Sequence, residues 1–217
     1  EDALTPEKIA SEIAAIDAVT ALDAEAKKEL VERLNKASKW LQDEADWARR
    51  KSELDTQLAS IPEQLRVVYE ELAKPSPPTQ IDFPTNPTVP QLETKLAELR
   101  HQVEIDEAAS KTKDDEVENR IKRISEITKD ATGIEANIAD AKIQLNTLTD
   151  VDLSSRIKQL EQKARLRCRQ RQLAALKAEQ QRWELVAELL PMQRDLAKRN
   201  ATNSKKLLQI WQTTVDT

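Results

Sequence analysis

The sequence contains few residues of the kinds that carry out chemistry. Its one cysteine, Cys168, lies among arginines, which would lower the pKa of an exposed thiol and make it reactive. No residue nearby in the sequence could act as its base, so we expect no catalytic role for Cys168. His101 is the only histidine, and one histidine far from one cysteine does not make a metal site. The sequence therefore predicts no catalytic residues, no metal and no cofactor.

A basic segment from Arg156 to Arg171 contains seven lysines and arginines against one acidic residue, Glu161. Clustered cations of this kind can bind phosphate groups or nucleic acid. The segment has no aromatic residue on which a base could stack, and alternate residues scatter around a helix. Residues 104–118 are acidic, and a helical bundle could set these two charged faces against each other. We favour structural, solvated roles for both segments and expect no nucleic-acid partner.

Two tryptophans could form a docking surface. Trp40 and Trp47 lie seven residues apart and are followed by Leu54, so they would share one face of a helix. Tryptophan is enriched at interface hot spots, but a neighbouring helix could also cover this stripe. We favour the second interpretation, because buried aromatic residues dominate cores as well as interfaces. The candidate interaction surface consists of two tryptophans and four arginines, namely Trp40, Trp47, Arg165, Arg167, Arg169 and Arg171.

The composition determines which elements must position these residues. The 217 residues include one glycine, where average usage would give about fifteen, so tight turns must be rare. Charged residues make up 34% of the chain and aromatic residues 3%, which favours narrow apolar seams between helices. The net charge of −5 gives no overall attraction to nucleic acid or to an anionic membrane. We predict an all-α fold of long antiparallel helices in elongated coiled-coil or helical-bundle layers.

Helix starts and seams can be located from the sequence. Capping residues predict four starts, at Thr5 before Pro6, at Asp23, at Thr88 with Gln91, and at Asp150 or Asp152. One apolar stripe follows Asp23 and consists of Leu30, Leu34, Ala37, Leu41, Ala45 and Ala48. The most regular spacing follows Thr88 and predicts the heptad seam Val89, Leu92, Leu96, Leu99 and Val103.

Three positions predict breaks within the helical segments. Ser60 and Glu63 form a capping box around Pro62, so a new helix should begin near Ile61. Gly133 predicts a break within residues 129–133. Pro191 should end or kink the helix that contains it. We therefore expect separate helical pieces on either side of each position.

Several of these helical segments resemble one known family. The segment "QLETKLAEL" at 91–99 directly follows a variable, proline-rich connection, and "AALKAEQQRWELVAELLPMQRDL" occupies 174–196. Both are similar to the N-terminal periplasmic region of large mechanosensitive channels of the MscS superfamily, the MscK (KefA-type) members. That region is called the mechanosensitive channel porin domain. The resemblance covers nearly the whole chain.

The resemblance implies a non-catalytic, extracytoplasmic domain of a mechanosensitive ion channel, located in the periplasm and attached to the bacterial inner membrane. The sequence has no run of about 18 apolar residues, so the membrane anchor and pore would lie in segments downstream. The full channel would be a homo-oligomer, expected to be heptameric. The domain would contribute to assembly or to tension-linked gating, with no small-molecule substrate. The alternative is a cytosolic coiled-coil scaffold or adaptor that binds partner helices.

The proline-rich connection at 74–90 holds six of the nine prolines. It could be a linker between domains, a ligand for a proline-binding partner, or a loop within one helical assembly. It lacks a basic "PxxP" pattern, and the segments on both sides belong to one family-like pattern. We therefore expect a single elongated domain over residues 1–217, with a stiff internal crossover at 74–90.

Overall fold

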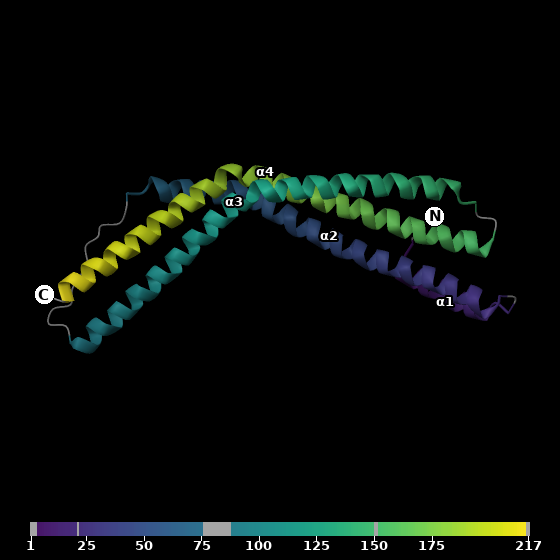
Figure 1. Cartoon of the computed structure of the whole chain (residues 1–217), viewed down its shortest axis with the longest axis horizontal. Helices are drawn as coiled ribbons and strands as arrows, with labels where there is room; N and C mark the ends of the chain where they lie inside the picture. Colours follow the sequence, from purple (N-terminus) through teal and green to yellow (C-terminus); the bar gives the residue numbers. More distant parts are fainter. Residues whose placement is uncertain (1–3, 21, 76–87, 150–151, 216–217) are drawn as a thin grey trace. The chain divides into compact units, whose positions relative to one another are not determined.

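A computed structural model describes residues 4–20, 22–75, 88–149 and 152–215 of the chain (Figure 1). These residues form four α-helices and no strand, which confirms the predicted all-α fold. The helices are α1 (Pro6–Ala18), α2 (Ala24–Ala73), α3 (Val89–Thr147) and α4 (Leu153–Val215). Most of the proline-rich connection at 74–90 lies outside the described residues.

The predicted helix starts are confirmed by their hydrogen bonds. The side-chain oxygens of Thr5, Asp23 and Asp152 each accept a bond from the backbone N–H three residues later, at 3.3, 2.8 and 2.6 Å. At the start of α3 the Gln91 side chain accepts a bond from the backbone N–H of Thr88, at 3.0 Å. Each cap satisfies a backbone donor that the first helical turn leaves without an intrahelical partner.

The predicted helix breaks are wrong. Pro62 lies inside α2, Gly133 inside α3 and Pro191 inside α4, and each helix continues through the residue. A proline removes one helical hydrogen bond, at a cost of about 3 kcal/mol in a helix interior. Ile61 and Leu190, directly beside the two prolines, are buried in a shared apolar cluster. Packing of this kind supplies most helical stability in proteins and here outweighs the local preference.

The chain divides into two compact units, and α2, α3 and α4 each contribute to both. Unit 1 consists of residues 1–57 and 125–182, and unit 2 consists of residues 58–124 and 183–217. The single domain expected over residues 1–217 stays a prediction.

The core of unit 1 is built where α1, the first part of α2 and the first part of α4 pack together. Its buried residues are Ile9, Ile16, Leu30, Leu34, Ala37, Leu41, Ile157 and Ala164. The predicted stripe on α2 is therefore confirmed from Leu30 to Leu41, whereas Ala45 and Ala48 are exposed. In this unit α2 and α4 run in the same direction, because Arg33 pairs with Glu161 and Arg50 with Glu179.

The core of unit 2 is a second apolar cluster, formed by Ile61, Val68, Val186, Leu189 and Leu190. Trp183 packs against this cluster, and its backbone oxygen accepts a hydrogen bond from Arg120 Nε at 2.7 Å. The predicted seam of α3 is half-buried from Leu92 to Val103, whereas Val89 at its start is exposed. Asp114 pairs with Lys198 and Glu107 with Lys205, so α3 and α4 are antiparallel in this unit.

Candidate functional site

The four arginines of the candidate surface form two pairs on α4. Arg165 and Arg169 are four residues apart and share one face of the helix, and the same holds for Arg167 and Arg171. A step of two residues is more than half a helical turn, so the two pairs point in different directions. The structure therefore separates residues that the sequence analysis had grouped into one surface.

Arg167 and Arg171 bind a carboxylate from α2. Arg167 Nη2 lies 3.0 Å from Glu44 Oε2, and Arg171 Nε lies 3.8 Å from Glu44 Oε1. Arg167 Nη1 also donates a hydrogen bond to the backbone oxygen of Leu4 at 2.7 Å. Glu44 is 9% exposed, so these two cations compensate the cost of burying its charge. Arg167 therefore joins α4 both to α2 and to the segment before α1.

Arg169 instead stacks on a tryptophan of α2. Its guanidinium carbon lies 4.8 Å from the centroid of the Trp40 ring, which is a cation–π contact. Arg169 Nη1 donates to Gln172 Oε1 at 2.6 Å. Arg165 Nη2 lies 3.8 Å from Asp140 Oδ2 on α3, which is an ion pair beyond hydrogen-bonding distance.

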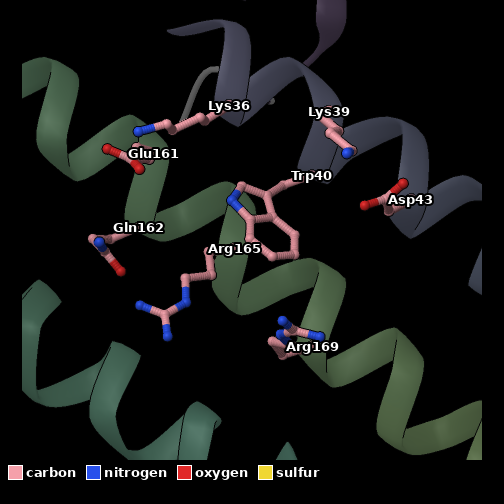
Figure 2. Close-up of a pocket in the computed structure, with 8 residues that line it drawn as sticks. All are labelled: Lys36, Lys39, Trp40, Asp43, Glu161, Gln162, Arg165 and Arg169. Carbon is pink, nitrogen blue, oxygen red and sulfur yellow. The ribbon is translucent and has the colours of Figure 1, made fainter. Parts of the chain in front are cut away.

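Trp40, Arg165 and Arg169 line a pocket of about 370 Å³ in unit 1, here called the Trp40 pocket (Figure 2). Figure 2 shows Trp40 extending from α2 toward α4, with Arg165 and Arg169 beside its ring. The remaining lining residues are charged or polar, namely Lys36, Lys39 and Asp43 from α2 and Glu161 and Gln162 from α4. The pocket thus combines one apolar wall with four cations and two carboxylates.

Sequence reasoning identified Trp40, Arg165 and Arg169 as site residues but missed the other five, Lys36, Lys39, Asp43, Glu161 and Gln162. Lys36 and Trp40 are four residues apart on α2, which would have placed them on one face. The register between α2 and α4 brings the two groups together, and the sequence pattern does not contain that register. Trp47, the other predicted surface tryptophan, is half-buried and does not line this pocket. Partner binding at these residues stays a prediction.

Cys168 is buried beneath this region and is 1% exposed. Burial, together with the negative charges of Asp43 and Glu44, raises the pKa of its thiol to about 11 against the opposing effect of Arg169. The low pKa that neighbouring arginines would give an exposed thiol therefore does not arise. At neutral pH the Cys168 side chain is a small apolar core group.

The basic and acidic segments belong to different units and pair with other residues. Residues 156–171 belong to unit 1, where Arg156 pairs with Glu12 at 2.7 Å. Residues 104–118 belong to unit 2, where Asp114 pairs with Lys198 at 2.8 Å. The acidic part of α3 pairs with the last part of α4, because the two helices are antiparallel in unit 2.

The described part of the chain contains neither a cluster of metal-binding side chains nor a helix that could span a membrane. It contains no group of three or more histidine, cysteine and acidic side chains arranged to hold a metal ion. In the same residues, no helix carries an apolar stretch long enough to cross a bilayer.

Comparison with known proteins gives one match. A family model described as "mechanosensitive ion channel porin domain" matches residues 12–217. Neither the curated proteins nor the solved structures contain a match to the chain.

Proposed function

The chain belongs to the mechanosensitive ion channel porin domain family, and from this premise we propose that it is an extracytoplasmic structural and regulatory domain of a mechanosensitive channel. This family is non-enzymatic. The domain contributes to channel assembly or to tension-linked gating and does not itself conduct ions. The observation that carries the proposal is the family match, which extends over almost the whole chain.

The parent protein in this proposal is an MscK-type channel of the bacterial inner membrane. The domain lies in the periplasm, the pore and membrane anchor lie in other segments of the parent, and the channel is a homo-oligomer. The resemblance of residues 91–99 and 174–196 to that channel type supports this finer assignment.

The contacts within unit 1 suit a domain that transmits force. Arg156 ties α4 to Glu12 of α1, and Arg33 ties α2 to Glu161 of α4 at 3.0 Å. The same three helices also share one apolar cluster. A bundle joined in this way resists shear between its helices, because sliding would break ion pairs and packing together.

Cysteine labelling in cells whose inner membrane is intact tests the proposed location. The exposed Lys122 is replaced in a Cys168→Ala background of the parent channel (Lys122→Cys), and cells with a permeabilised outer membrane receive a membrane-impermeant maleimide. We expect labelling without lysis of the inner membrane. The protein with its natural Cys168 is the matched control and should stay unlabelled, because that thiol is buried. Labelling of Lys122→Cys only after inner-membrane lysis would contradict the proposal and favour a cytosolic scaffold.

A further inference from the structure

We propose that the Trp40 pocket binds a phosphate monoester, with Arg165 and Arg169 holding the phosphate and Trp40 packing against the organic part. This binding site goes beyond the role in channel assembly or gating. It rests on the charge of the pocket, on donors that the fold leaves without acceptors, and on the size and wall of the cavity.

The charge of the pocket favours a dianion. Four cations line it, and Glu161, one of its two carboxylates, is already paired with Arg33 at 3.0 Å. Arg165 is partly compensated by Asp140 at 3.8 Å, so Asp43 faces three further cations, Lys36, Lys39 and Arg169. A phosphate monoester carries about −1.5 to −2 charges at pH 7 and presents three strong acceptor oxygens. A carboxylate, with one charge, would compensate this site less well.

Both arginines have N–H groups that can still donate hydrogen bonds to a ligand. Arg169 Nε is buried and has no acceptor in the described part of the chain, although Nη1 of the same group is bound to Gln172. Arg165 has its ion-pair partner Asp140 at 3.8 Å, which leaves its N–H groups without a close acceptor there. Arginines four residues apart on one helix face can address a single oxyanion together. Both arginines line the pocket, so each can contact an anion bound there.

Gln162 provides a second sign that a polar ligand fits this site. Its Oε1 atom is buried and has no donor among the described residues. Buried polar atoms in folded proteins are nearly always hydrogen-bonded, so such an atom needs an explanation. Hydroxyl groups on the organic part of a phosphate ester would supply the missing donor after a small rotation of the amide.

The cavity is larger than a simple ion needs. Its volume of about 370 Å³ falls within the range of small-molecule sites, about 300–1,000 Å³. The Trp40 ring, which stacks on Arg169, supplies an apolar wall beside the cations. The ligand class is therefore an organic phosphate monoester, either a soluble ester or the headgroup of a phosphatidic lipid.

A titration with glycerol 3-phosphate tests the proposal. The 217-residue chain is titrated at constant ionic strength, and binding is monitored by ¹H–¹⁵N NMR. The indole N–H signal of Trp40 is assigned from its loss in Trp40→Phe. We expect this signal to shift and saturate, while the signals of Trp183 and Trp211 in unit 2 stay in place. The experiment needs no channel, so its outcome does not depend on the role of the domain in gating.

Three variants make the titration specific. Arg169→Gln should weaken binding at least about tenfold, because one charge-assisted bidentate contact is lost. Arg171→Gln removes the same charge from the same helix outside the pocket and should leave binding unchanged. Lys36→Gln changes an exposed residue that lines the pocket, so this variant should fold without repacking of the core. It should weaken binding about threefold. Equal weakening by Arg169→Gln and Arg171→Gln, or no saturable shift with any probe, would overturn the proposal.

A second experiment with lipid vesicles distinguishes a lipid headgroup from a soluble phosphate ester as the ligand. Cosedimentation with phosphatidic acid vesicles, compared with phosphatidylcholine vesicles, reports binding to a lipid headgroup. Arg169-dependent cosedimentation supports a lipid phosphate, and an Arg169-dependent shift with glycerol 3-phosphate alone supports a soluble ester. Absence of both overturns the proposal.

Discussion

The properties of single side chains in unit 1 depend on the neighbouring helix more than on residues nearby in sequence. Cys168 lies between arginines, yet burial and the carboxylates of Asp43 and Glu44 raise the pKa of its thiol. Arg167 and Arg169 are adjacent in the alternating pattern, yet one binds Glu44 and the other stacks on Trp40. Local sequence therefore predicted the residue types of the candidate site but not their electrostatic environment.

At the residue scale, the cap of α4 predicts a pH-dependent stability. The backbone hydrogen bond from Ser155 lowers the pKa of Asp152 below its usual value of 3.8, because the bond favours the ionised form. A lowered folded-state pKa means that the stabilisation is present above the unfolded pKa and is lost as the pH falls through the folded pKa. Asp152→Ala should therefore lower the melting temperature by a few degrees at pH 7 and have little effect near pH 2.

Thermal unfolding followed by circular dichroism from pH 2 to pH 7 measures this effect. Asp152→Asn is the matched control, because asparagine caps helices without titrating. The control should retain most of the stability at pH 7 and show less dependence on pH. An equal loss in Asp152→Ala at pH 2 and pH 7 would refute the role of the ionised cap.

At the scale of elements, the helices are longer than local signals predict. The cap residues Thr5, Asp23 and Asp152 were predicted correctly because a cap acts through a hydrogen bond three residues away. The predicted breaks at Pro62 and Pro191 failed because the helices on both sides of each proline share one buried cluster. Contacts between helices decide continuity, and a single-sequence pattern does not contain them.

Gly133 offers a direct test of helix continuity. It lies inside α3, and a Cβ atom added there would meet no heavy atom within 4 Å. Gly133→Ala should therefore raise the free energy of unfolding by about 1 kcal/mol, because alanine loses less backbone entropy in a helix. Gly133→Pro should lower it by about 3 kcal/mol or more. Urea unfolding measures both, and destabilisation by alanine would show that α3 is not helical at this position.

At the scale of the whole molecule, composition and capping predicted the all-α class, and the resemblance predicted the family. The stripe from Leu30 to Leu41 forms the α2 side of the core of unit 1, as its spacing indicated. The Trp40 pocket was only partly predictable, because it depends on the register between α2 and α4. Sequence patterns describe one face of one helix, whereas a pocket needs two faces in register.

We propose that this domain regulates a tension-gated channel. Patch-clamp recording of the parent channel tests it most directly, comparing the intact protein with Leu34→Lys, which places a charge at a fully buried core position of unit 1. Glu32→Lys adds a lysine at an exposed position two residues away and is the matched control. We expect Leu34→Lys to raise the pressure needed for opening at unchanged unitary conductance and Glu32→Lys to leave it unaffected. An unchanged threshold in Leu34→Lys, at equal channel number and with unit 1 shown to be unfolded, would contradict it.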